Sequence, residues 1–245
     1  MNSDELHVRL AAIRDRVTVA AEKSGRSGDG VTVIAVTKTH PASTVARLRG
    51  TGLTDLGENR VQEAATKIEE LGHAPWRWHL IGSLQSNKAA QAVRLFDVVH
   101  SVDSPKLARR LDRVVADDPE RGPLPILLQV NVAGEASKSG FDVRGPGDGE
   151  RWERFLDTVR EIAALPNLVP YGLMTIAPFE DDPERVRPCF RALAHLRDAL
   201  REHVPDRDWR ELSMGMSNDF EAAIEEGATL VRIGRALLGD RETTA

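Results

Sequence analysis

VTVIAVTKTHP, residues 31 to 41, is an almost uninterrupted run of apolar and β-branched residues that reaches a lysine near its end. A run of this length, rich in Val, Ile and Thr, is typical of a strand buried on both faces in a parallel sheet. Lys38 then stands at the carboxyl end of the strand, where α/β folds gather their functional groups. A partly desolvated lysine there has a lowered pKa and can act as an amine nucleophile. The alternative is a surface lysine that merely ends a strand.

Seven further strand patterns follow, and helical patterns separate them. The strand patterns cover residues 53–59, 76–82, 96–102, 125–132, 168–175, 209–215 and 229–234. Before the first strand, apolar residues recur at steps of three and four between Ser3 and Lys23, which predicts one amphipathic helix. Eight strand–helix units in a 245-residue chain predict an α/β fold with a single closed (β/α)8 TIM barrel and one extra N-terminal helix. A doubly wound open sheet is the alternative.

Composition limits the class of protein. The chain is 41% hydrophobic and 29% charged, which is ordinary for a soluble globular domain, and no segment approaches the roughly 18 apolar residues of a membrane span. Its single cysteine, Cys189, excludes an internal disulfide and favours a reducing compartment. A net charge of -5 gives no attraction for nucleic acid. We expect a cytoplasmic monomer with one domain over residues 1–245, in which residues 1–25 form the helix and residues 31–240 the barrel.

Two loops near the C-terminus carry most of the functional information. Residues 213–218, SMGMSN, and residues 232–235, RIGR, each place a glycine between a strand and a helix. The loops after strands seven and eight of a barrel form its common phosphate site, so Gly215 and Gly234 predict close approach of the backbone to an anion. Arg232 interrupts an apolar strand and must find an acceptor or an anion near the barrel mouth.

Other polar residues at strand ends have simpler explanations. Asn59 is at least as well explained as a helix cap, and His79 as a satisfied core histidine. The lysine, the phosphate loops and the arginine together indicate a phosphorylated carbonyl compound held as a Schiff base. Two candidates remain at this point: a sugar phosphate in a lysine-dependent aldolase, or pyridoxal 5'-phosphate (PLP).

A set of motifs then narrows this choice. AVTKTHP, LGENRVQE, WHLIGSLQSNK, SKSGF, GLMTI and LSMGMSNDFEAAIEEGATLVRIG together resemble the YggS/PROSC family of PLP homeostasis proteins, which share the barrel of alanine racemase (PLP fold type III). The resemblance implies that Lys38 holds PLP as a Schiff base and that Arg232 faces the pyridine nitrogen. It also implies a phosphate contact from the side chain of Ser217 and the backbone of Gly234 and Arg235. The residues that it implies along the cofactor are Asn59, Ser213 and Met214.

Two positions depart from the family pattern. Ser83 stands where the family often has proline, and Arg235 stands where it often has threonine. The second departure puts a side-chain phosphate contact at residue 235 in doubt.

The resemblance implies a non-catalytic role. An arginine at the pyridine nitrogen favours its unprotonated form, which weakens the cofactor as an electron sink. The C-terminal β domain of alanine racemase is also expected to be missing. We therefore expect a PLP carrier or buffer that supplies apo-enzymes and affects amino-acid and keto-acid balance, with no catalytic residue and no metal. A PLP-dependent racemase or lyase is the alternative. Lys138, in SKSGF, is either a second PLP site or a solvated loop lysine.

Overall fold

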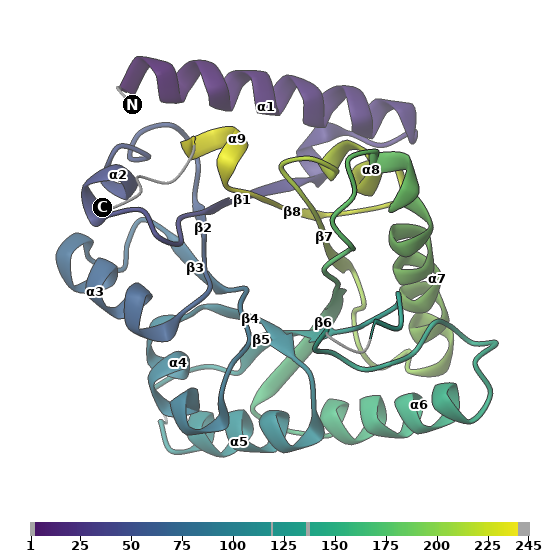
Figure 1. The fold of residues 1–245 in the computed structure, drawn as a ribbon. Coiled ribbons are helices and arrows are strands. Elements are labelled where there is room, and N and C mark those ends of the chain that lie inside the picture. The colour runs from purple at the N-terminus through teal and green to yellow at the C-terminus, as the bar shows by residue number, and fades with distance from the viewer. Residues whose placement is uncertain (1–2, 119, 136–137, 240–245) are drawn as a thin grey trace.

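Eight parallel strands form a closed barrel in the order of the chain, and helices surround it (Figure 1). The computed structural model describes residues 3–118, 120–135 and 138–239. The strands are β1 (Thr32–Val36), β2 (Asp55–Glu58), β3 (Arg77–Leu80), β4 (Val98–Val102), β5 (Leu124–Gln129), β6 (Leu168–Met174), β7 (Glu211–Met216) and β8 (Leu230–Ile233). The structure confirms the predicted (β/α)8 barrel, while the last residues of the predicted domain, 240–245, lie outside the described part.

The helices follow the predicted alternation. They are α1 (Ser3–Lys23), α2 (Ala42–Ala46), α3 (Val61–Leu71), α4 (Ala89–Leu95), α5 (Pro105–Ala116), α6 (Glu150–Ala163), α7 (Arg187–His203), α8 (Phe220–Glu225) and α9 (Arg235–Leu238), with short 3-10 turns η1 (Gly28–Gly30), η2 (Ser86–Lys88) and η3 (Pro183–Arg185). None of the helices in the described ranges combines the length and apolar character that crossing a membrane requires.

The barrel closes where β1 pairs with β8. Their register brings Thr32 opposite Leu230 and Ala35 opposite Ile233. One apolar core fills the space between the strands and the helices. A smaller apolar cluster lies inside the barrel and consists of Ile34, Val98, Leu127, Tyr171, Met174 and Leu230.

The end of β1 differs from the sequence prediction. The strand ends at Val36, so Lys38 lies in the following turn and is not the last residue of the strand. The turn is closed by a hydrogen bond in which the His40 N–H donates to the carbonyl of Thr37 at 3.1 Å. Thr39, directly after the lysine, has a φ of 67°, which is unfavourable for a β-branched residue.

The helix-cap explanation of Asn59 is also wrong, and Ser217 does not cap α8 either. α3 begins after Arg60, so Asn59 does not cap it. α8 begins after Asp219, whose side chain accepts the Met216 N–H at 2.6 Å, so Ser217 does not cap that helix. Both residues consequently keep their side chains for other contacts.

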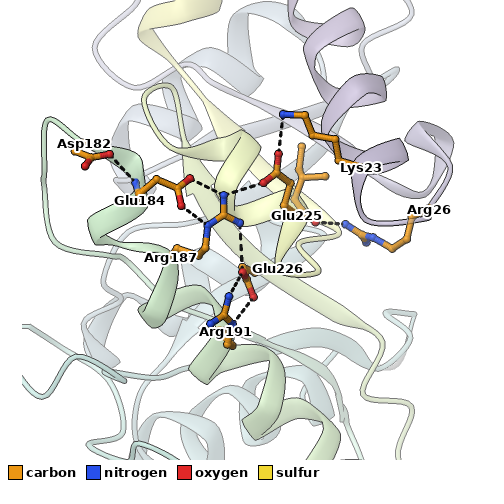
Figure 2. A network of polar contacts seen from close by, with 9 residues as sticks. Lys23, Arg26, Asp182, Glu184, Arg187, Arg191, Glu225 and Glu226 are labelled. Atoms are coloured by element: carbon orange, nitrogen blue, oxygen red, sulfur yellow. Dashed lines mark hydrogen bonds and ion pairs between the residues drawn. The ribbon is translucent and has the colours of Figure 1, made fainter.

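An ion-pair network holds the N-terminal end of α7 against α8 and α1 (Figure 2). The Arg187 guanidinium lies 2.8 Å from Glu225 of α8, 3.3 Å from Glu226 directly after that helix, and 2.6 Å from Glu184 of η3. Lys23 of α1 adds a pair with Glu225 at 3.1 Å. The network therefore ties the N-terminal helix to the last part of the barrel.

We predict that Arg187→Ala lowers the free energy of unfolding by about 1 to 3 kcal/mol, because it removes the cation that Glu225 and Glu226 share and leaves each with one partner, Lys23 or Arg191. Hydrogen bonds from Arg191 and, to a smaller extent, Arg187 lower the pKa of Glu226, and a hydrogen bond from Arg187 lowers that of Glu225. A carboxylate with a lowered pKa stabilises the fold above its ordinary pKa of about 4.3, and the contribution disappears as the pH falls through the folded-state value. The difference from wild type should therefore be present at pH 7 and vanish in acid.

Urea unfolding at several pH values measures this difference. Arg185→Ala is the matched control, because Arg185 is 71% exposed in its pair with Glu180 and should change stability by less than about 0.5 kcal/mol. Equal losses in the two variants would contradict the prediction.

Candidate functional site

A cavity of about 510 Å³ opens at the carboxyl ends of the strands. This volume lies within the range of small-molecule sites. Six of the eight predicted site residues line it: Lys38, Asn59, Ser217, Arg232, Gly234 and Arg235. Apolar side chains, among them Val36, Ile81 and Ile176, form other parts of the wall. Residues from both ends of the chain meet here because β1 and β8 are neighbours in the closed barrel.

The structure places Ser213 and Met214 away from the cavity wall. Ser213 is fully buried beneath the cavity, where its hydroxyl accepts a hydrogen bond from Arg232. Met214 is fully buried in the core between strands and helices. The pairing of β7 with β8 shifts register between Ser213 and Met216, and Met216 lines the cavity instead. A β-bulge changes which side chains face a barrel mouth, and simple alternation along the strand does not reveal it.

Arg232 is a buried cation at the floor of the cavity. Its side chain donates to the hydroxyl of Ser213 at 2.7 Å and to the carbonyl of Thr175 at 2.8 Å. Burial lowers the pKa of Arg232 to about 10, and the nearby Asp219 opposes this shift. The guanidinium is therefore a cation at neutral pH, held by two hydrogen bonds from inside the barrel.

The two glycine-containing loops are joined to each other at the cavity wall. The Ala236 N–H donates to the Ser217 hydroxyl at 3.2 Å, and the Arg235 guanidinium donates to the side-chain oxygen of Asn218 at 2.8 Å. Because the Ser217 hydroxyl accepts this bond, it keeps its own hydrogen to donate to an anion. Gly215 has a φ of 90°, and a Cβ there would lie 2.6 Å from the Cβ of Ala223, so this turn requires glycine.

The loop that carries Lys38 is fixed from outside the barrel by α3. The Lys67 ammonium donates to the carbonyl of Thr37 at 2.7 Å, and the Glu63 carboxylate accepts the Thr39 N–H. These bonds hold the residues on both sides of Lys38 and account for the unfavourable backbone conformation at Thr39. Sequence reasoning missed this role of α3, because a Lys and a Glu four residues apart are typical of any exposed helix face.

Lys67 also forms a buried ion pair. It is 4% exposed and donates to the Oε1 atom of Glu58 at 2.5 Å, while the Thr37 hydroxyl donates to the same atom at 2.6 Å. The Oε2 atom of Glu58 is buried and has no hydrogen-bond partner among the described residues. Burial raises the pKa of Glu58, and Lys67 opposes the shift.

Three titratable residues of the cavity wall were not singled out from the sequence. His40 lies two residues after Lys38, Glu180 lies in the loop after β6, and Asp219 precedes α8. Burial raises the pKa of Asp219, while the Met216 N–H and Arg232 favour its ionised form. Lys138 does not line the cavity; its ammonium lies 2.8 Å from Glu135 in the loop after β5. Within the described ranges, no group of three or more His, Cys, Asp and Glu side chains is arranged to hold a metal ion.

An amine, a buried guanidinium and two joined glycine turns line one cavity, which is typical of a barrel protein whose mouth suits a small anionic compound. The family model of the alanine racemase N-terminal domain matches residues 8–242. The pyridoxal phosphate homeostasis protein of Pseudomonas aeruginosa is 45% identical, with coverage of 95% of this chain and 94% of the relative. That of Aquifex aeolicus is 38% identical, with coverage of 96% and 97%. The chain belongs to the alanine racemase N-terminal domain family, within the pyridoxal phosphate homeostasis proteins, as the motifs predicted.

Solved structures agree with this assignment. PipY of Synechococcus elongatus, solved with PLP bound, is 36% identical with a TM-score of 0.80, covering 96% of this chain and 100% of PipY. An alanine racemase from Clostridium difficile, in complex with cycloserine, is 16% identical with a TM-score of 0.71, covering 96% of this chain and 59% of the racemase. The second likeness is one of fold.

We predict that Lys67→Met destabilises the protein by about 3 to 5 kcal/mol at pH 7, because it leaves Glu58 buried without its cation. Loss of the cation raises the pKa of Glu58 further. A carboxyl group with a raised pKa gives its full stability below the ordinary value of about 4.3, and this stability is lost as the pH rises through the folded-state pKa. The defect should therefore be smallest near pH 4 and grow toward neutral pH.

The double variant Glu58→Gln/Lys67→Met is the control, because it removes both charges and should recover most of the stability at pH 7. Urea unfolding of the three proteins between pH 4 and pH 8 measures the effect. A Lys67→Met defect that is independent of pH would contradict the role of the charge.

Proposed function

We propose that the protein binds PLP through Lys38 and takes part in intracellular PLP homeostasis as a carrier or buffer. The observation that carries the proposal is the single cavity that unites Lys38, Arg232 and the two joined loops. The names of the relatives and the PLP-bound structure of PipY support it. Supply of PLP to apo-enzymes, a monomeric state and a cytoplasmic location are parts of the same proposal.

The residues of the cavity fit the chemistry of PLP. Lys38 supplies an amine for a Schiff base, and Ser217 supplies a hydroxyl on the side where a phosphate needs donors. The backbone at Gly234 adds to this side, next to Val36 of the neighbouring strand β1, which lies 3.5 Å from where a Cβ would stand. Arg235 places a further cation at the rim, which offsets the missing hydroxyl at that position in the family pattern. Asn59 lines the wall beyond Lys38.

The charge of Arg232 argues for holding the cofactor over using it. PLP serves as an electron sink when its ring nitrogen is protonated. Arg232 has only donors to offer and stays protonated at neutral pH, so beside that nitrogen it favours the unprotonated form. Tyr171, the only tyrosine, is buried in the apolar cluster inside the barrel, where burial raises its pKa to about 12. It cannot serve as an acid or base in the cavity.

We predict that Lys38→Ala abolishes the absorbance band of lysine-bound PLP and the borohydride-reducible linkage, since both depend on the amine. Lys138→Ala is the matched control, because Lys138 lies outside the cavity and pairs with Glu135. It should keep the band, the linkage and the rate of PLP release. Absorbance spectra with and without borohydride, followed by peptide mapping, provide the measurement. A label on a lysine other than Lys38 would refute the assignment.

A racemase or lyase activity is the second candidate, and His40 is the observation that favours it. His40 lines the same cavity as Lys38 and could act as a second proton-transfer group. We expect exchange of the amino-acid Cα proton, followed by NMR in D2O, to proceed no faster with the PLP-loaded protein than with free PLP. Sustained turnover that His40→Ala removes would overturn the carrier proposal in favour of catalysis.

A further inference from the structure

Five polar side chains form a continuous hydrogen-bonded chain inside the barrel. Asp55 Oδ1 lies 2.8 Å from His79 Nε2, and His79 Nδ1 lies 2.8 Å from His100 Nε2. His100 Nδ1 lies 2.9 Å from the hydroxyl of Ser213, which accepts from Arg232 at 2.7 Å. The chain thus crosses from β2 through β3, β4 and β7 to β8. It joins the amino-terminal end of the barrel to the floor of the cavity.

This polar chain is not needed to fill the barrel. Barrel interiors are usually filled by branched apolar side chains, and the neighbouring cluster around Ile34, Val98 and Leu127 follows that rule. Both histidines and Ser213 are 0% exposed. Burying such groups costs free energy unless every one of them is hydrogen-bonded. Apolar side chains at these positions would stabilise the barrel at a lower cost. Stability alone therefore does not explain this hydrogen-bonded row of polar side chains.

The donors and acceptors of the chain allow one consistent direction. Burial opposes ionisation of Asp55, but hydrogen bonds from His79 and Thr54 lower its pKa, so the carboxylate is an acceptor. His79 then donates from Nε2 and, being neutral, accepts at Nδ1 from His100. His100 in turn accepts at Nδ1 from the Ser213 hydroxyl. Burial lowers the pKa of both histidines, which agrees with two neutral rings.

The donor-to-acceptor direction of these hydrogen bonds determines whether the Ser213 hydroxyl can accept from Arg232. Because the serine hydrogen points to His100, an oxygen lone pair faces the guanidinium. If His79 lost its acceptor at Asp55, the two imidazoles could exchange tautomers and the serine hydroxyl could turn around. Its hydrogen would then face the donors of Arg232, and the arginine would lose one of its two fixed acceptors.

We propose that Asp55, His79, His100 and Ser213 are positioning residues, which orient the Arg232 guanidinium at the floor of the cavity toward the ring nitrogen of the cofactor. The inference rests on the proposed function, because it gives the orientation its purpose. The chain does not deliver a proton to the cavity. Arg232 ends it, and an arginine whose pKa lies at about 10 keeps its protons at neutral pH.

The first test compares Asp55→Asn and Ser213→Ala for binding of PLP. Asn keeps the shape of Asp but can offer its amide hydrogens to His79, so the direction of the chain is no longer fixed. Each variant should raise the Kd for PLP about tenfold, the scale on which hydrogen-bonded partners of a ligating group act. Each should also change the absorbance spectrum of the bound cofactor, which reports the surroundings of its ring. The double variant should be no worse than the single ones, because the chain is already broken.

Leu127→Val is the matched control. It alters the apolar cluster inside the barrel and replaces none of the five polar residues. It should lower the midpoint of urea unfolding and leave the Kd and the spectrum unchanged. A purely structural role of the polar chain predicts the same pattern for Asp55→Asn and Ser213→Ala, and that pattern would overturn the proposal.

A second measurement uses the protein without PLP. Proton NMR should show two low-field imidazole N–H signals that are protected from exchange, one from His79 and one from His100. Asp55→Asn should shift or remove both, and Leu127→Val should keep them. If wild type fails to bind PLP, the proposed function fails and the inference falls with it. If wild type binds PLP and both chain variants retain its Kd and spectrum, the function stands and the positioning role is refuted.

Discussion

The pairing of β1 with β8 is the constraint on which the rest of the structure depends. Lys38 and Arg232 are far apart in sequence, and they share a cavity because the first and last strands are hydrogen-bonded neighbours. The N-terminal helix reinforces this closure from outside. Arg26, just beyond α1, donates to the carbonyls of Ile224 and Ala228 at 2.5 and 3.1 Å, immediately before β8 begins. The closed sheet, which has no free edge, therefore fixes the relative positions of the groups in the site.

Two buried polar systems then convert this frame into a defined site, and both lie behind the cavity wall. Outside the barrel, Lys67 and Glu63 hold the backbone on either side of Lys38 and keep Thr39 in a conformation that it would not adopt alone. Inside the barrel, Ser213 and the carbonyl of Thr175 hold Arg232. Each system contains charges whose removal from water costs stability. Their hydrogen bonds fix the positions of the groups that line the cavity. The lysine is thus fixed through its backbone, and the arginine through its side chain.

The sequence predicted the architecture well because each strand and helix of the barrel has its own local pattern of apolar residues. Alternating strand and helix periods, with functional residues at strand ends, were enough to name Lys38, Arg232 and the two glycine loops. The sequence did not reveal the register shift in β7, and in the structure Met216 lines the cavity while Met214 lies in the core. The polar side chains that are linked to Arg232 through Ser213 could not be predicted from the sequence for another reason. Asp55, His79 and His100 lie on three different strands, and only the closed barrel brings them together.

Arg232 shows how stability and function are balanced in this fold. A guanidinium that is 5% exposed has lost nearly all of its water, and an apolar side chain of similar size would cost less at that position. What an apolar residue cannot supply is a fixed cation with hydrogens to donate and no lone pair to accept a proton. In the proposed complex with PLP, such a group would face the ring nitrogen and oppose its protonation. Under the proposed function, the residue that makes the barrel less stable is therefore also the one that favours holding the cofactor over activating it.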